Sequence, residues 1–312
     1  MYNPTKPYKH KILRLIEDTW DTPYLKVRRG VYPIFTKKFS GFEIQHTDGI
    51  GTKGFYHWNK KTLKNAVIDV LAMNLNDLAL AGAVPYAVSD HITIPDDGEK
   101  HIIEIVKNLS SICKKYKIAI VGGETSHHDN TDALDISITM SGFVPKIREN
   151  QFRVGDVLVG LKSNGLHSNG FTKVRSMFRE NEWRDAFIQP TVIYLNTILD
   201  LLEKYEIHGM MHITGGAFTK LKDLLIGADA EISTPNKLSP RPIFHELYKR
   251  GISDEDMYRT FNCGVGFILS ASEKDAKEIV ASTPHAAIIG RVVKGKGLVC
   301  IQSAFSGRTI VL

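Results

Sequence analysis

In the first half of the chain, segments whose apolar residues recur with the period of a helix alternate with segments that have the period of a strand. This alternation restricts the fold more than any other feature of the sequence. The patterns predict the following order: strand 42–47, helix 62–83, strand 86–94, helix 99–117, strand 118–121 and strand 134–144. Ile118–Val121 is apolar throughout, which is typical of a strand covered on both sides. Helices and strands that alternate in this way predict an α/β layer.

The chain of 312 residues is long enough for two domains. Pro145–Gly155 is charged and lacks apolar periodicity, so we place the domain boundary there. The second half opens again with a strand and a glycine-rich loop, and it keeps a rough α/β plan. The expected division is a basic arm over residues 1–40, a first domain over 41–146 and a second domain over 156–312.

The composition is that of a globular protein, with 43% hydrophobic and 24% charged residues, which argues against disorder. The net charge of +6 comes from basic residues that are mostly spread out, a pattern that suits phosphorylated small molecules. We therefore expect no nucleic-acid partner. The sequence has no apolar run of membrane-spanning length, so we expect a cytoplasmic protein without a membrane partner.

Two glycine-bracketed acidic stretches, His46–Lys53 and Ile118–Thr125, each follow a predicted strand. We expect their glycines to lie where the sheet ends and backbone amides are free to bind phosphate. Lys53 is expected to face phosphoryl oxygens as well. Asp48 and Glu124 can hold the divalent cation that neutralises those phosphates.

Asp77 and Asn74 fall within the apolar stripe of the predicted helix 62–83. An acid on a buried helix face costs several kcal/mol unless it is paired or bound to a metal. Asp77 is therefore either a satisfied structural acid or an active-site acid, and the sequence leaves both interpretations open.

Two histidines lie beside glycine-rich loops in the second half. His167 lies between Gly165 and Gly170, so we expect its ring at a loop mouth and not in the core; the alternative is an ordinary surface turn. His212 precedes the paired Gly215 and Gly216, whose amides can bind an anion, although a structural histidine is the alternative. Together they suggest a cleft with a metal nucleotide on one wall and a second phosphorylated ligand on the other.

A third group resembles a metal site in composition only, and it contains His127, His128, Asp129, Asp132 and Asp135. Adjacent histidines point apart in an extended chain and lack the i, i+4 spacing of a helical site. We interpret this group as a solvated loop.

Several of these motifs, taken in order, resemble the aminoimidazole ribonucleotide synthetase family, the phosphoribosylformylglycinamidine cyclo-ligases of purine synthesis. The matching segments are His46–Lys53, Ala72–Pro85, Gly122–Thr125, Gly165–Arg175, Met211–Phe218 and Arg259–Gly266. The combination of Gly-Gly-Glu-Thr, Gly-Leu-His-Ser-Asn-Gly and His-Ile-Thr-Gly-Gly points to this branch of its superfamily.

The resemblance implies a two-domain α/β fold of the α+β type, whose first sheet forms a barrel at the interface of a homodimer. It implies ATP and Mg2+ as cofactors, with K+ as a further candidate. The implied substrate is formylglycinamidine ribonucleotide or a similar phosphorylated small molecule. In the implied reaction ATP phosphorylates the formyl amide oxygen, and a nitrogen then displaces phosphate to close the imidazole ring.

The resemblance also implies roles for individual residues. The implied catalytic residues are Asp77, His167 and His212, and the implied metal ligands are Asp48, Asp77 and Glu124. The implied nucleotide-binding residues are Gly49, Gly51, Thr52, Lys53, Gly122, Gly123 and Thr125. The implied substrate-binding residues are Ser168, Asn169, Thr214, Gly215 and Gly216.

The chain differs from the family pattern at two places, Tyr32–Gly41 in front of the first acidic stretch and Ser126–Asn130 after the second. Two alternatives therefore stay open beside a cyclo-ligase. One is a superfamily member that phosphorylates another small molecule, and the other is a non-catalytic paralogue that binds nucleotide.

Overall fold

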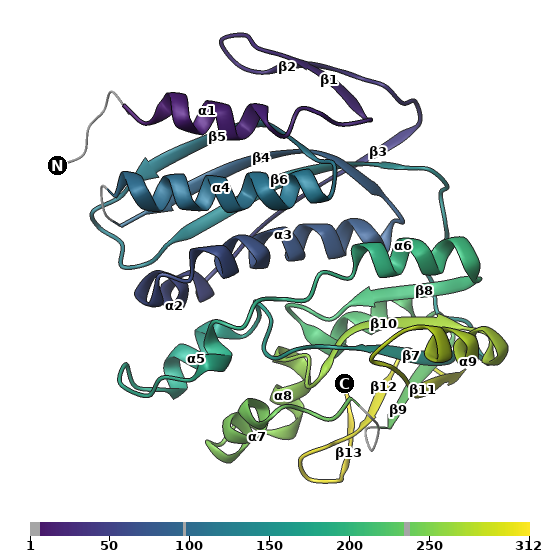
Figure 1. Ribbon diagram of the computed structural model, residues 1–312. Coiled ribbons are helices and arrows are strands. Elements are labelled where there is room, and N and C mark those ends of the chain that lie inside the picture. The colour runs from purple at the N-terminus through teal and green to yellow at the C-terminus, as the bar shows by residue number, and fades with distance from the viewer. Residues whose placement is uncertain (1–6, 96–97, 234–237) are drawn as a thin grey trace. The chain divides into compact units, whose positions relative to one another are not determined.

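The computed structural model describes residues 7–95, 98–233 and 238–312. The chain forms two compact units, residues 1–146 and 147–312, each with its own sheet (Figure 1). The division falls at the start of the charged segment 145–155. Residues 1–6 of the expected arm lie outside the described part of the chain.

The first unit combines helices with a four-stranded sheet. Its elements are α1 (Lys9–Glu17), β1 (Leu25–Arg28), β2 (Ile34–Lys37), β3 (Phe42–Gly49), α2 (Lys53–Lys60), α3 (Leu63–Leu80), β4 (Val84–Ile94), α4 (Glu99–Lys115), β5 (Ala119–His127) and β6 (Asp135–Val144). The sheet has the order β3-β6-β4-β5, and β1 pairs with β2 separately. Only β4 and β5 are parallel neighbours within this sheet. The predicted mixed α/β class is confirmed.

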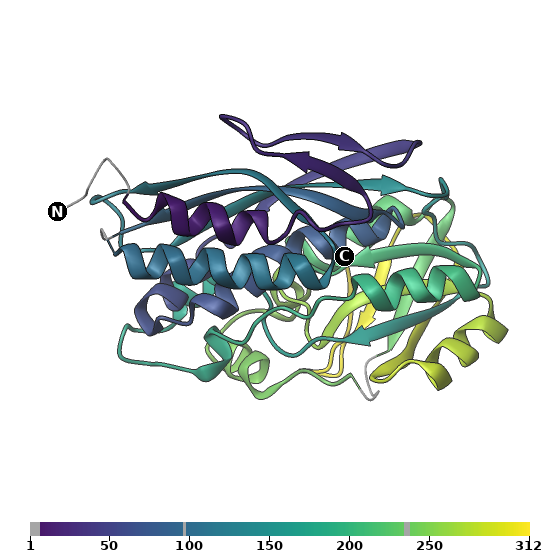
Figure 2. The same cartoon turned by 45° about the horizontal axis from the view of Figure 1, so that its top comes forward.

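One face of this sheet is apolar and covered by helices, whereas the other face is polar. Along β6, Ile136, Ile138 and Met140 are buried, and Ser137 and Thr139 alternate with them on the opposite face. Helix α3 contacts β3, β4 and β6, and α4 lies beside both α3 and α1 (Figure 2). The buried apolar residues of β6 therefore lie on the face that packs against α3.

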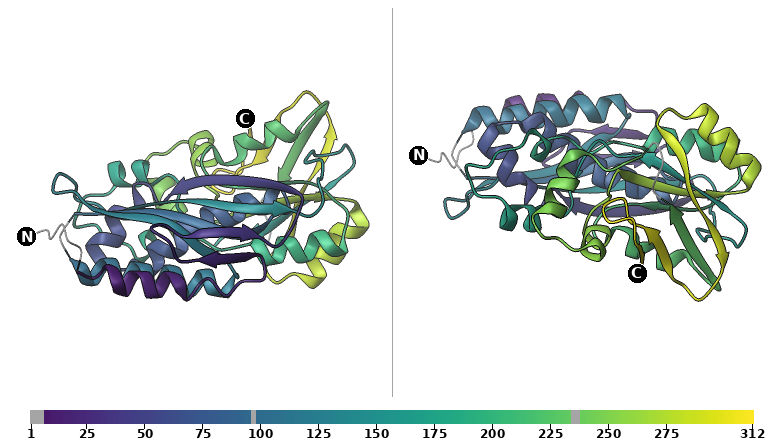
Figure 3. Two further views of the ribbon diagram at one scale, coloured as in Figure 1. Left: turned by 90° about the horizontal axis from the view of Figure 1, so that it is seen from above. Right: turned by 90° about the horizontal axis from the view of Figure 1, so that it is seen from below.

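The sheet of the first unit is open, with β3 and β5 at its edges (Figure 3). The barrel expected from the family resemblance is not formed by the described residues of a single chain. Each edge strand leaves one row of backbone groups without a strand neighbour in this sheet.

The acids of both stretches lie inside strands, so the prediction that the strands end before them is wrong, although β3 does end at Gly49, next to the turn at Gly51. β3 continues through Asp48 to Gly49, and β5 continues through Gly122–Thr125. The reason is parallel pairing, because Gly123 lies opposite Asp90 of β4. A side chain at Gly123 would crowd the Asp90 carboxylate, so the glycine marks a close approach and not a turn.

The second unit is built on a seven-stranded sheet of order β13-β12-β9-β11-β7-β10-β8. Its strands are β7 (Val157–Lys162), β8 (Ile207–His212), β9 (Ala228–Ser233), β10 (Val265–Ala271), β11 (Ala286–Lys294), β12 (Val299–Gln302) and β13 (Thr309–Val311). Its helices are α5 (Phe171–Met177), η1 (Asp185–Phe187), α6 (Leu195–Lys204), η2 (Ala217–Leu224), α7 (Pro242–Lys249), α8 (Asp254–Thr260) and α9 (Glu273–Ser282).

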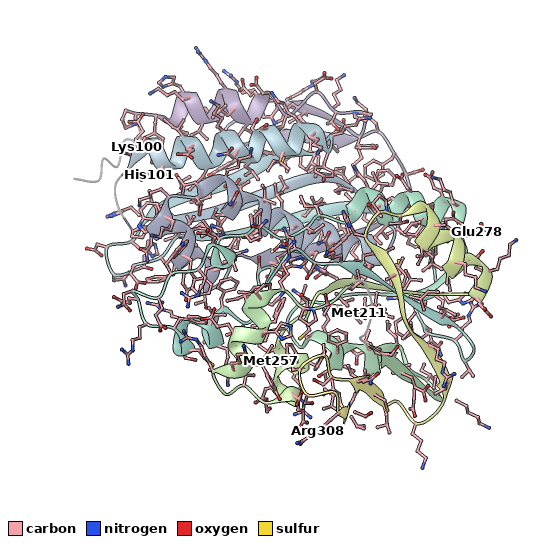
Figure 4. The ribbon with its side chains drawn as sticks, turned by 60° about the horizontal axis from the view of Figure 1, so that its bottom comes forward. Lys100, His101, Met211, Met257, Glu278 and Arg308 are labelled. Carbon is pink, nitrogen blue, oxygen red and sulfur yellow. The ribbon has the colours of Figure 1, made fainter. Side chains whose placement is uncertain are left out.

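Side chains from both the strands and the helices fill the core of this unit. Met211 of β8 and Met257 of α8 are buried, whereas Glu278 and Arg308 are exposed (Figure 4). Helix α9 contacts β7, β10 and β11. In the described part of both units, no helix has the length and apolar content needed to cross a membrane.

A fully buried network of charged side chains joins α2 to α3. The Lys53 ammonium lies 2.8 Å from one Asp69 carboxylate oxygen, and His57 Nε2 lies 2.7 Å from the same oxygen. All three side chains are 0% exposed. Burial alone raises the pKa of Asp69, but the charge of Lys53 and hydrogen bonds from both partners outweigh it and bring the pKa to about 2.

We predict that Asp69→Asn destabilises the first unit strongly. The substitution leaves the Lys53 ammonium buried without its counter-charge, which costs about 3–5 kcal/mol for a buried pair. Urea unfolding of the variant and of the exposed control Asp21→Asn measures the difference. A loss of less than about 1 kcal/mol, the level of an exposed pair, would contradict a stabilising role for the network.

The same network predicts an acid-sensitive stability. A carboxylate whose folded pKa is below its unfolded value stabilises the fold above that unfolded value, about 3.9 for Asp. This contribution is lost as the pH falls through the folded pKa of about 2. Between pH 4 and pH 2 we therefore expect wild-type protein to lose more unfolding free energy than Asp69→Asn, and equal losses would refute the assignment.

Candidate functional site

The alternation of β3 places two predicted residues on the face that packs against α3. His46 lies opposite Met140 of β6, and Asp48 lies opposite Ile138, so both point to the helix-covered side. Asn74 and Asp77 are three residues apart on α3, which puts them on one side of that helix. Side chains of the edge strand β3 and of helix α3 therefore form one group.

His46 is the centre of this group. Its Nδ1 lies 3.0 Å from Asn74 Oδ1, and its Nε2 lies 3.2 Å from Asp77 Oδ2. The Asn74 amide nitrogen donates to Val70 O at 2.9 Å and to Asp48 O at 3.3 Å, which directs Oδ1 toward the histidine. Because both ring nitrogens face acceptors, the geometry favours the doubly protonated imidazolium.

The pKa of His46 agrees with this geometry. The hydrogen bond to Asp77 raises it most, burial opposes the rise, and Asn74 together with the charge of Asp48 adds to it. The cation so formed holds the Asp77 carboxylate in place. Asp77 is therefore a satisfied acid that is still 17% exposed, and its role as an active-site acid stays a prediction.

His46, Asp48 and Asp77 are also suited to a divalent cation. One ligand atom from each lies within 4.8 Å of the others, and this is the group of that kind among the described residues. The two carboxylates are ligands that Mg2+ accepts, whereas His46 in its imidazolium form has no lone pair for a metal and orients Asp77 instead. The residues present fit the metal that the family resemblance implies.

Glu124, the third predicted metal ligand, does not join this group within one chain. It lies opposite His91 on β4, and the row of His91 is the polar face of the sheet, away from α3. Within one chain the group therefore contains His46, Asp48 and Asp77, and the role of Glu124 as a metal ligand stays a prediction. The alternation of β5, which the sequence analysis took for a loop, is the physical reason.

Asp90 of β4 is an acid that the sequence analysis missed. It lies opposite Ile138, the same residue that Asp48 faces from the other side, so Asp90 and Asp48 share a row on the helix-covered face. Burial raises the pKa of Asp90 to about 7, and the charge of Glu124 adds to the effect. The strand pairing that places it opposite Gly123 of the Gly-Gly-Glu-Thr motif reveals it, and the sequence alone does not show that pairing.

The predicted nucleotide-binding residues fall into two groups. Gly49 ends β3, Gly51 has a left-handed φ of 55° and Thr52 caps α2, so these three surround the start of a helix. Lys53 is different, because its ammonium is fully buried against Asp69. The predicted contact of Lys53 with phosphate is therefore replaced by an internal ion pair. The remaining predicted residues, Gly122, Gly123 and Thr125, lie in the edge strand β5.

In the second unit the two predicted histidines are buried around Tyr194. His167 and His212 are both 0% exposed, and their ring centroids lie 6.2 Å and 6.5 Å from that of Tyr194. The expectation that His167 lies at a loop mouth and not in the core is therefore wrong. A side chain at Gly266 would overlap the Tyr194 hydroxyl and crowd His167, so this glycine permits the arrangement.

The predicted substrate-binding residues of the second unit lie on two loops that meet. A side chain at Gly215 would contact Asn169 Oδ1 at 3.9 Å, and the Asn169 amide nitrogen is buried with no hydrogen-bond partner. Ser168 pairs with Thr191 at 2.9 Å, and Lys220 donates to Thr214 at 3.0 Å. Because buried polar groups are normally hydrogen-bonded, the unpaired amide nitrogen of Asn169 indicates a position where a ligand binds. The fifth predicted residue is the exposed Gly216.

Comparisons with known proteins match both units. Residues 41–144 match the N-terminal domain model of AIR synthase related proteins, and residues 153–302 match the C-terminal domain model. The chain is 33% identical over 301 residues to a phosphoribosylformylglycinamidine cyclo-ligase of Saccharolobus solfataricus, covering 93% of this chain and 91% of the relative. The corresponding enzyme of Methanosarcina acetivorans is 36% identical over 267 residues, 80% of this chain and 79% of the relative.

A solved structure of the hydrogenase maturation protein HypE in complex with ATP has the same fold. It superimposes with a TM-score of 0.65 at 17% identity, over 97% of this chain and 93% of that chain. Fold, site and domain matches together define a two-domain AIR synthase related protein. Within that class, the chain belongs to the phosphoribosylformylglycinamidine cyclo-ligase family.

We predict that Asp77→Asn weakens binding of Mn2+, used as a spectroscopic substitute for Mg2+, at least about tenfold. The amide keeps the volume of the side chain but removes the charge that a cation and His46 both contact. Electron paramagnetic resonance of free Mn2+ measures the affinity. Asp129→Asn in the rejected His127–His128 loop is the control, and the account fails if that variant loses more affinity than Asp77→Asn.

Proposed function

We propose that this protein catalyses ATP-dependent ring closure of formylglycinamidine ribonucleotide to aminoimidazole ribonucleotide. The observation that carries the proposal is the match to cyclo-ligases over nearly the whole chain, with the motif residues Asp77, His167 and His212 in place. The retained acidic group in the first unit and the histidine loops in the second supply two sets of polar side chains. They are assigned here to the nucleotide and the substrate.

The first unit is assigned to ATP and its metal ion. Asp48 and Asp77 would hold Mg2+, with His46 orienting Asp77 from behind. Bound Mg2+ supplies charge neutralisation for the phosphates of ATP. The start of α2, where Gly51 and Thr52 lie, offers backbone amides to a phosphate.

The second unit is assigned to the ribonucleotide substrate. Asn169 has a buried amide nitrogen that no described residue accepts from, and Thr214 places a hydroxyl beside the ammonium of Lys220. An amide donor and a cation suit the oxygens of a phosphorylated sugar. His167 and His212 are proposed to act through the closure of these loops around the substrate. That the acidic group and the histidines share one cleft remains a prediction.

The chemistry explains why both ATP and acid-base groups are needed. The oxygen of an amide is a poor leaving group, and phosphorylation converts it into phosphate, a good one. The attacking nitrogen then forms the new carbon–nitrogen bond, the carbon–oxygen bond to phosphate breaks, and one proton leaves the ring nitrogen. A group that accepts this proton contributes about 10²–10⁴-fold to such a step.

A homodimer joined through the first unit is part of the proposal. It is supported by the exposed edge strand β3 and by exposed apolar side chains nearby in the sequence. These are Val31 at 97%, Tyr32 at 80%, Ile34 at 66% and Phe42 at 67% exposed. Two open sheets that pair face to face would cover these groups and form the expected barrel. The solution mass measured by light scattering is expected to be twice 34.9 kDa. The mass of a single chain would contradict the proposed homodimer and its barrel.

The direct experiment supplies purified protein with formylglycinamidine ribonucleotide, ATP and Mg2+. We expect aminoimidazole ribonucleotide and inorganic phosphate in equal amounts, measured by mass spectrometry and a phosphate assay. Phosphate transfer to a different acceptor would favour a kinase-like superfamily member. Tight ATP binding without any product would favour a non-catalytic paralogue.

Asp77→Asn is expected to lower kcat at least about a hundredfold. Because the variant keeps the shape of a side chain that is 17% exposed, its unfolding midpoint is expected to change little. Asp21→Asn, an exposed acid in the same unit, is the matched control for activity. Wild-type turnover in Asp77→Asn would rule out this site.

A further inference from the structure

The second unit contains a hollow that is lined by none of the residues assigned above to the reaction. Its volume is about 530 Å³, which is within the usual range for small-molecule sites. It lies between the end of β7, one face of α6 and the turn from α9 to β11. All of its lining residues belong to this unit.

The lining is rich in cations without partners. Lys162, Lys204 and Arg241 each line the hollow, and their side chains form no ion pair or hydrogen bond in the described part of the chain. His285 lies beside them, and Asp200 is the one acid among the lining residues. By contrast, the surface cations Lys277 and Arg259 are each paired with a glutamate four residues away. Three unpaired cations against one acid favour an anionic ligand.

A buried acceptor in the same wall adds a second requirement. The Asn164 amide nitrogen donates to Pro190 O at 2.7 Å, which fixes the orientation of the amide. Its Oδ1 is buried and has no hydrogen-bond partner among the residues that the structure describes. A buried carbonyl oxygen without a partner is unfavourable, so a ligand with a hydroxyl or N–H donor at this point would satisfy it.

The hollow also shares a wall with the histidine pair. Tyr194 lines it, donates its hydroxyl to Lys162 O at 2.7 Å and places its ring near both His167 and His212. The loop that carries Asn164 continues directly to His167. A ligand in the hollow therefore touches the same side chain and the same loop that position the two histidines.

We propose that this hollow binds a phosphorylated sugar, with its phosphate facing Lys162, Lys204 and Arg241 and a sugar hydroxyl donating to Asn164 Oδ1. The shared chemistry covers two sources, a free sugar phosphate and the phosphoribosyl end of the substrate itself. The assignment does not depend on the proposed reaction, because binding needs neither ATP nor turnover.

The test is calorimetric titration of the full-length protein with ribose 5-phosphate in the absence of ATP. We expect saturable binding that is stronger than binding of inorganic phosphate, because only the sugar reaches Asn164. Lys204→Glu and Arg241→Glu are expected to weaken it at least about tenfold each, the loss of one charge-assisted contact. Both positions are exposed, so neither reversal disturbs the core.

Arg308→Glu is the matched control, since Arg308 is exposed (Figure 4), makes no side-chain ion pair with any described residue and does not line the hollow. The proposal is overturned if wild-type protein shows no saturable binding, if neither hollow variant weakens it, or if Arg308→Glu weakens it equally. Competition by formylglycinamidine ribonucleotide would identify the substrate as the source, and its absence would identify a free sugar phosphate. Loss of binding with intact ring closure would reject the hollow alone and leave the proposed function standing.

Discussion

The hydrogen bonds from His46 to Asn74 and Asp77 are the interaction on which the first unit's site depends. They tie an edge strand, which has a neighbour on one side only, to the central helix of its layer. Acids and amides on a buried helix face destabilise a fold when they lack partners, and here each of these polar groups has one. A cation held between these acceptors keeps the carboxylates of Asp48 and Asp77 close without a metal. The site is thus organised before a ligand arrives, as electrostatic catalysis requires.

In the second unit, close packing and not ion pairing holds the site side chains in position. Gly266 lacks a side chain where Tyr194 and His167 come closest, so the aromatic and imidazole rings share one small volume. The loops on either side then meet at Asn169 and Gly215. Among the described residues, Asn169 and Asn164 beside this cluster each carry a buried polar atom without a hydrogen-bond partner. Both atoms lie where ligands are proposed to bind.

Local periodicity predicted the long elements well, because a stripe or an alternation is visible in the sequence itself. The predicted helix 62–83 is observed as Leu63–Leu80, and the predicted helix 99–117 is observed as Glu99–Lys115. The short strands β1 and β2 were not predicted within the arm, since a few residues cannot show a period. Asp77 was selected because an acid on an apolar stripe is conspicuous, but its partner His46 comes from a strand 31 residues away, and no local pattern encodes such a contact.

Two errors share one cause, which is that glycines were taken to mark exposed turns. Gly122–Gly123 continues a strand beside Asp90, and His167, placed between Gly165 and Gly170, is buried against Tyr194. The most direct test of the whole account is anomalous diffraction from crystals grown with Mn2+ and a non-hydrolysable ATP analogue. The account predicts an ion within coordination distance of the Asp48 and Asp77 carboxylates. An ordered ion bound elsewhere in the chain, with both carboxylates unoccupied, would contradict it.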